Sequence, residues 1–198
     1  MIGVKCVRIF VLCMVCSLVF SCSSMAHIAE RQVDEIIAEA KPFNDGGNYA
    51  DAVLHYESAL VRYPDEPRLR YNFAIALAQS GDLTRSASVL QRLSAEHESN
   101  DLTYLKALGG VAAAGNISDT AVESWMRVVE LDPMDSDTRF RLMRYLIEIE
   151  SYEAAYELGL AAYRLHVFEP ELFEMLEILE RQTGRGDGSS WSIILTDQ

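Results

Sequence analysis

The chain lacks the residue patterns that disulfides, metal sites and catalytic centres need. Its four cysteines all lie within the first 22 of 198 residues, so the rest of the chain can hold neither a disulfide framework nor a cysteine-based metal site. The four histidines are widely spaced and form no paired metal-ligand motif. Glycine-rich phosphate loops and the Gly-x-Ser-x-Gly nucleophile turn are absent. We therefore expect no catalytic residues, no metal and no cofactor, and hence no enzyme.

Basic residues are scarce as well. The chain has 17 Lys and Arg against 30 Asp and Glu, a formal net charge of −13 at pH 7. Two of the basic residues lie in the first 21 positions, which hold no acidic residue, so the remainder has 15 basic against 30 acidic residues and a net charge of −15. Such a surface repels nucleic acid and anionic lipid. We therefore expect no nucleic-acid partner and no electrostatic attachment to a membrane.

No apolar run reaches the roughly 20 residues that a membrane-spanning helix needs. The longest, from Ile9 to Phe20, follows two basic residues and precedes a small serine, which is the layout of a secretory signal. The stretch from Leu18 to Cys22 resembles a bacterial lipobox, although Phe20 is bulkier than the usual residue at its position. This resemblance implies that Cys22 becomes the acylated first residue of the mature protein, carrying chains such as palmitate.

We therefore expect a lipoprotein signal peptide over residues 1–21 and a tether over 22–32, with the membrane reached through N-terminal acyl chains. The alternative is an ordinary signal peptide with a coincidental cysteine. Ser23 after the cysteine fits outer-membrane sorting in the better-known lipoprotein systems. The resemblance thus implies a lipid-anchored protein of the bacterial cell envelope that faces the periplasm, at the outer rather than the inner membrane.

What the chain has in abundance is a repeat of about 34 residues, the period of stacked helix-turn-helix units. Each copy reads as two amphipathic helices around a turn, and such a unit cannot bury its apolar face alone. One further amphipathic helix, 171–182, would cover the last apolar face. The predicted helix pairs are 33–43 with 49–63, 68–79 with 83–98, two helices within 101–133 around a turn at 115–116, and two within 136–167.

The slots of this repeat hold small, aromatic, glycine and proline residues at fixed spacing, and the pattern resembles the tetratricopeptide repeat (TPR). The residues that carry it in the first two copies are Ala40, Gly47, Tyr49, Ala52, Tyr56, Ala59, Pro64, Ala74, Leu77, Gly81, Leu83, Ser86 and Leu90. The resemblance implies an all-α solenoid over 33–183, with about four repeats and a C-terminal capping helix, followed by a flexible tail over 184–198. It also implies that the small and aromatic residues are core, with aromatics such as Trp125 filling the gaps between helices.

Three features depart from the family pattern. Pro42 lies inside the first helix and should kink or end it near Lys41, because proline lacks the backbone N–H and clashes with the preceding turn. Glu150 and Ser151 replace the usual glycine turn of the fourth repeat. The turn of the third repeat carries one extra residue, which leaves the register of that repeat's first helix uncertain by one.

The resemblance also implies where partners bind, because the first helix of each TPR lines the concave face. In repeats two to four those helices carry six basic and three acidic residues, whereas the second helices of all four repeats carry five basic and eleven acidic ones. We therefore expect a locally basic groove that binds protein partners through an acidic or C-terminal peptide segment. Merely solvated charges are the alternative. The candidate groove residues are Lys41, Arg68, Tyr71, Asn72, Ile75, Gln79, Lys106, Phe140, Arg141 and Arg144.

A carboxylate clamp of the TPR type is matched only in part. Asn72 stands where the clamp has its asparagine, but Lys106 replaces an arginine and Ile37 replaces a lysine. The function that the resemblance implies is a membrane-anchored scaffold in an envelope complex, of the kind that assists outer-membrane protein or pilus assembly. Two alternatives stay open: an adhesin that uses the integrin-type Arg-Gly-Asp tripeptide at 185–187, and an accessory subunit of a solute transporter. Homo-oligomerisation through the end faces or the tail is also open.

Overall fold

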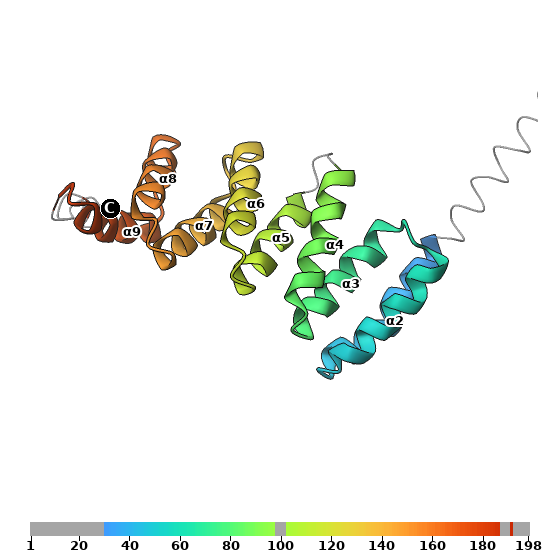
Figure 1. Cartoon of the computed structure of the whole chain (residues 1–198). Helices are drawn as coiled ribbons and strands as arrows, with labels where there is room; N and C mark the ends of the chain where they lie inside the picture. Colours follow the sequence, from blue (N-terminus) through green and yellow to red (C-terminus); the bar gives the residue numbers. More distant parts are fainter. Residues whose placement is uncertain (1–29, 98–101, 187–190, 192–198) are drawn as a thin grey trace, which may run out of the picture. The chain divides into compact units, whose positions relative to one another are not determined.

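The computed structural model describes residues 30–97, 102–186 and 191. All regular secondary structure in these residues is α-helical (Figure 1), and successive helices pack side by side within each compact unit, which confirms the predicted all-α fold. The predicted signal peptide, Cys22 and most of the tether lie outside the described residues, as do 187–190 and 192–198 of the predicted tail.

The chain forms two compact units, residues 1–80 and 81–198. In unit 1 a helix over residues 30–45 precedes α2 (Tyr49–Arg62) and α3 (Pro67–Gln79), and α2 packs along α3. In unit 2 each helix packs on the next, so that the elements stack in chain order. The helices of unit 2 are α4 (Leu83–Glu96), α5 (Leu102–Ala114), α6 (Ser118–Leu131), α7 (Ser136–Glu148), α8 (Tyr152–Arg164) and α9 (Pro170–Thr183).

The predicted repeat pairs are confirmed to within two residues at most helix ends, and the first helix is the exception. It includes residues 30–32, which were assigned to the tether, and it continues through Pro42 to residue 45. The predicted helix end near Lys41 is therefore wrong. Pro42 lies near the end of the helix, where the N–H of Gly46 donates to the Pro42 carbonyl at 3.0 Å and the N–H of Asn48 donates to the Phe43 carbonyl at 2.8 Å. One proline therefore removes one bond of this helix without ending it.

Three of the repeats use the same turn between their two helices. In each, the N–H after the turn donates at 2.8 Å to the carbonyl five residues earlier, and the residue before that N–H has a left-handed backbone, as in a Schellman motif. In the fourth repeat this left-handed residue is a glutamate, Glu150, which is strained because its Cβ approaches the following carbonyl. The fourth repeat therefore keeps the same turn without the usual glycine. The left-handed residues are Gly47 (φ 72°), Asn116 (φ 56°) and Glu150 (φ 59°).

The third repeat has the ordinary turn length, which corrects the prediction of an extra turn residue. Its turn, 115–117, is as long as the turn of the fourth repeat, 149–151. The extra residue therefore lies in the connection between α4 and α5. With that register Gly109 takes the slot of the small residue in α5, and a Cβ built on it would lie 2.5 Å from Nε1 of Trp125.

The close contacts between helices pair a small side chain with a large one. In unit 1 the corresponding slots hold Ala40 and Tyr56, which are 0% and 1% exposed. The third repeat has Gly109 against Trp125, and the fourth reverses the order: a Cβ built on Gly159 of α8 would lie 2.9 Å from Cε of Met143 on α7. Because interiors are close-packed, a small residue is needed on one of the two helices at each of these contacts, and which helix carries it differs between the repeats.

Candidate partner-binding surface

The predicted groove residues divide between the two units. Helix 30–45 and α3 of unit 1 carry one set, and α5 and α7 of unit 2 carry the other. The residues of unit 1 are Lys41, Arg68, Tyr71, Asn72, Ile75 and Gln79, and those of unit 2 are Lys106, Phe140, Arg141 and Arg144. Each set therefore belongs to a single unit.

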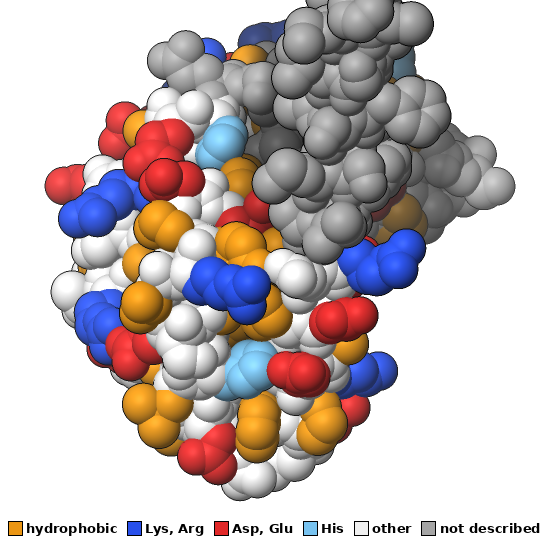
Figure 2. Space-filling view, turned by 90° about the vertical axis from the view of Figure 1, so that its right-hand side faces the viewer, with side chains coloured by type: hydrophobic (Ala, Val, Ile, Leu, Met, Phe, Trp, Pro, Cys, Tyr) orange, Lys and Arg blue, Asp and Glu red, His pale blue; other side chains and the backbone are white. Residues whose placement is uncertain are grey.

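In unit 1 two of the polar candidates, Arg68 and Asn72, are bound to other groups of the same unit. The Arg68 guanidinium contacts Asp34 at 2.5 Å, and this hydrogen bond raises the pKa of Arg68. The Asn72 amide donates to the Arg68 carbonyl at 2.8 Å, so it lies along its own helix. On the face shown in Figure 2, acidic and basic side chains are interspersed with hydrophobic ones, so the net negative charge is not gathered into one area of that face.

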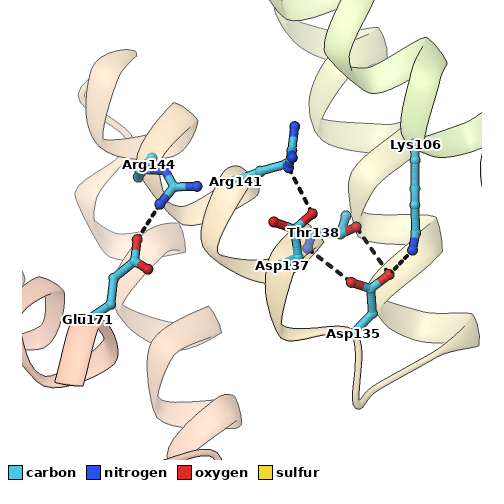
Figure 3. Close-up of polar contacts among 7 residues, drawn as sticks. All are labelled: Lys106, Asp135, Asp137, Thr138, Arg141, Arg144 and Glu171. Atoms are coloured by element: carbon cyan, nitrogen blue, oxygen red, sulfur yellow. Dashed lines mark hydrogen bonds and ion pairs between the residues drawn. The ribbon is translucent and has the colours of Figure 1, made fainter. Parts of the chain in front are cut away.

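In unit 2 three cations of the predicted groove form ion pairs on α5, α7 and α9 (Figure 3). Lys106 of α5 pairs with Asp135, which precedes α7. Arg144 of α7 pairs with Glu171 of α9. Arg141 contacts Asp137 of its own helix, with 2.9 Å between Nε and Oδ2. We call Arg141, Arg144 and their partners Asp137 and Glu171 the α7 polar face.

Asp135 makes the pair with Lys106 different from the other two. Its carboxylate is the N-cap of α7 and accepts hydrogen bonds from the Thr138 N–H at 3.1 Å and the Thr138 hydroxyl at 3.2 Å, while its side chain is only 8% exposed. Burial by itself raises the pKa of Asp135, but the hydrogen bonds from Lys106 and Thr138 outweigh burial and hold it below its usual range. Lys106 therefore ties α5 to the start of α7, and a ligand would have to break that link to use it.

Two residues that were assigned to the groove are buried in the core. One is Arg139, which contributed to the count of basic residues on the first helices, and the other is the groove candidate Phe140. Arg139 is 2% exposed and donates to the Pro133 carbonyl at 2.6 Å, while its Nε has no acceptor among the described residues. Burial lowers the pKa of Arg139. Phe140 is 3% exposed, so its predicted role as a ligand contact is wrong for this structure. The helical period, which also buries Leu142 and Met143, was the signal that could have separated these residues from Arg141 and Arg144.

The Arg-Gly-Asp tripeptide is not presented as a free motif. The Arg185 guanidinium lies 4.9 Å from the centre of the Tyr156 ring and contacts Glu153 at 3.1 Å and Glu157 at 3.4 Å, all on α8. Asp187 lies outside the described residues. An adhesin needs this arginine to be available to a receptor, so the contacts weigh against that alternative. They also show that the predicted flexible tail contacts the folded unit at this residue.

Unit 2 also has an open groove that the sequence did not predict. Its volume is about 700 Å³, and it lies among α4, α5 and α6, with leucines of α5 and polar residues of α6 along its walls. Such a hollow depends on the distance between helices, which no sequence motif encodes. Among the described residues no cluster of three or more His, Cys, Asp or Glu could hold a metal ion. None of the described helices combines the length and apolar character that a membrane span requires.

Stacked helix pairs, repeated left-handed turns and paired small and large residues together define a solenoid of helix-turn-helix repeats. The fold is that of tetratricopeptide repeat proteins: residues 45–109 match the tetratricopeptide repeat family model, and solved TPR proteins share the fold over most of the length of this chain. No curated protein matches the sequence.

Three solved structures illustrate the likeness. MamA of AMB-1 has a TM-score of 0.63 at 23% identity, over 83% of this chain and 89% of that one. MamA of MSR-1 has a TM-score of 0.60 at 20% identity, over 79% and 88%. A tetratricopeptide repeat protein from Parabacteroides merdae ATCC 43184 has a TM-score of 0.66 at 17% identity, over 79% of this chain but 62% of its own length. At these identities the likeness establishes the fold.

Proposed function

We propose that this TPR protein is a scaffold that binds a protein partner through the α7 polar face, where Arg141 and Arg144 contact an acidic segment of the partner. The TPR fold suits this role, because stacked helical hairpins present an extended surface to other proteins. The observation that carries the proposal is that both arginines are exposed on one helix and that, within the described part of the chain, their ion pairs are with exposed carboxylates (Figure 3).

The two arginines can exchange partners at small cost. Their side chains are 55% and 53% exposed, and those of Asp137 and Glu171 are 69% and 42% exposed. Exposed ion pairs typically contribute about 0–1 kcal/mol, so a partner carboxylate can replace either one. Lys106 is not part of the proposed contact, because the carboxylate of its ion-pair partner Asp135 is buried and caps α7.

Charge reversal on α7 tests the proposal. Partners would be captured by crosslinking in intact cells and identified by mass spectrometry, with the native chain and with the double variant Arg141→Glu, Arg144→Glu. The matched control is Arg92→Glu with Arg164→Glu, which reverses two exposed arginines on α4 and α8 that line neither the α7 polar face nor the open groove. We expect the α7 variant to lose the partners that the control retains. Capture of the same partners by the α7 variant would sink the proposal.

We propose further that the scaffold is anchored in the bacterial envelope through Cys22, faces the periplasm and belongs to a complex of the outer-membrane or pilus assembly type. Support comes from the sequence before residue 30, with its two basic residues, its apolar run and the lipobox-like stretch that ends at Cys22. Metabolic labelling with an alkyne analogue of palmitate tests the anchor. The native chain should be labelled and sediment with membranes, whereas Cys22→Ala should do neither. Labelling that is unchanged in Cys22→Ala would exclude this anchor.

A further inference from the structure

Aromatic side chains gather at the end of unit 2, where α8 and α9 meet Trp191. Tyr163 of α8 lies edge to face against Trp191, with 5.4 Å between ring centroids, and against Phe173 of α9 at 6.3 Å. Phe168 lies nearly parallel to Phe173 at 6.4 Å. Phe173 is buried, whereas Phe168 is 43% exposed, so the cluster reaches from the core to the surface. We call Tyr163, Phe168 and Phe173 the aromatic end face.

In a repeat array such an end face is normally covered by the next repeat. Here no repeat follows α9 among the described residues, and the indole of Trp191 packs against the core of unit 2 instead. Its Nε1 is buried and has no acceptor among the described residues. A buried N–H without an acceptor weakens the contact, because tryptophan normally satisfies this donor when it is buried. Trp191 therefore covers the end face, but less firmly than a core residue would.

Arg185 is a second anchor between the end of α9 and Trp191. The helix ends at Gly184 with φ 67°, and the Arg185 N–H donates to the Glu180 carbonyl at 3.0 Å in a Schellman motif that turns the chain back. The guanidinium then contacts Tyr156, Glu153 and Glu157 of α8. The C-terminal segment thus brings a cation to an acidic, aromatic site on α8 and an indole to the aromatic end face.

We propose that the aromatic end face is a recognition site for Trp191 of this chain's own C-terminal segment, filled by Trp191 of the same molecule in the monomer and by Trp191 of a second copy when the chain self-associates. Exchange of an identical element needs no new contacts, which makes it a low-cost route to a dimer. The unsatisfied indole N–H favours release of Trp191. The proposal goes beyond the scaffold function and does not use the α7 polar face.

The intramolecular half is tested by tryptophan fluorescence. The chain has two tryptophans, so Trp125→Phe leaves Trp191 as the reporter. We expect blue-shifted emission and several-fold weaker acrylamide quenching than for free indole, and Arg185→Ala should raise the quenching. Arg181→Ala is the control, because Arg181 pairs with Glu177 on α9 and not with the segment. Quenching of Trp191 equal to that of free indole overturns the proposal. Should Trp125→Phe fail to fold, faster amide exchange of α8 and α9 in Trp191→Ala than in the native chain gives the same readout, and equal exchange overturns it.

The intermolecular half is tested by mixing two variants. Trp191→Ala has an intact end face without its indole, and Tyr163→Ser has a damaged face and a displaced indole. Sedimentation velocity should show mixed dimers only when the two are combined. Replacing the second variant by Tyr163→Ser with Trp191→Ala should abolish them. Absence of mixed dimers, or equal association of Trp191→Ala alone, overturns exchange of the segment between copies.

Discussion

Gly109 and Gly110 are neighbours in α5, and we expect their substitution by alanine to have opposite effects on stability. Alanine in a helix interior is more favourable than glycine by about 0.5–1 kcal/mol, because the unfolded chain loses less backbone freedom. At Gly110 a Cβ would meet nothing within 4 Å, so this gain should appear in full. At Gly109 a Cβ would lie 2.5 Å from Nε1 and 2.6 Å from Cδ1 of Trp125.

The contact at Gly109 is costly because its partner is rigid. Trp125 is 6% exposed, and its ring atoms cannot move aside as the end of a flexible side chain can. Overpacking of this kind costs about 1–3 kcal/mol, which exceeds the gain from alanine. We expect Gly109→Ala to lower the free energy of unfolding by up to about 2 kcal/mol, and each kcal/mol corresponds to a Tm change of about 2–4 °C in a chain of this size.

Urea unfolding followed by far-UV circular dichroism measures both effects. Gly110→Ala should raise the midpoint at unchanged slope, and Gly109→Ala should lower it. Shortening the partner supplies a second check: Gly109→Ala should cost less in a Trp125→Leu background than in the native one, as a coupling energy between contacting residues. If Gly109→Ala is as stable as Gly110→Ala, the register assigned to the third repeat and the reasoning about close contact are both wrong.

Three further predictions concern single residues. Ala52 is fully buried, so Ala52→Trp should overpack unit 1 and cost about 1–3 kcal/mol or more, measured as a lower Tm; an unchanged Tm would contradict its core position. The folded-state pKa of Asp135 is below its unfolded value, so its stabilisation is present above the unfolded pKa and is lost as pH falls through the folded pKa; Asp135→Asn should therefore lower the urea midpoint at neutral pH and converge with the native chain in acid. Glu150 has φ 59°, so Glu150→Gly should relieve strain and raise the free energy of unfolding by up to about 1 kcal/mol, seen as a higher urea midpoint, and a loss of stability would argue against the left-handed turn.

The helices could be predicted well from the sequence because the same pattern of small, aromatic and turn residues recurs in each repeat. A period that recurs in four copies averages out local exceptions, so Glu150 in a glycine slot did not obscure the fourth turn. Errors arose where a single residue carried the inference. Pro42 was given more weight than its place near the helix end justified. Gly109 was missed because the extra residue was placed in the turn and not between α4 and α5.

The candidate site was harder to predict because it depends on distant partners. Counting charges on the first helix of each repeat could not reveal that Arg144 meets Glu171, which is 27 residues away on the capping helix. The same count included Arg139, which the helical period places in the core and not on the surface. In a repeat protein the ion-pair partner of a charged residue depends on which elements pack beside it, whereas the fold depends on the repeat pattern. The repeat pattern can be recognised in the sequence, but the ion-pair partners cannot.

The neutralised α7 polar face restricts what the proposed partner can be. A single partner carboxylate that displaces Asp137 or Glu171 exchanges one exposed ion pair for another, and the displaced acid stays beside it, so the net gain is close to zero. Charge can therefore select an acidic partner and steer its approach, but affinity has to come from other contacts. Several acidic groups in one segment would engage Arg141 and Arg144 together and reduce the entropy lost for each pair. We infer that the partner presents a short run of carboxylates beside apolar residues. We also infer that added salt lowers the association rate more than it lowers the fraction of partner bound at equilibrium.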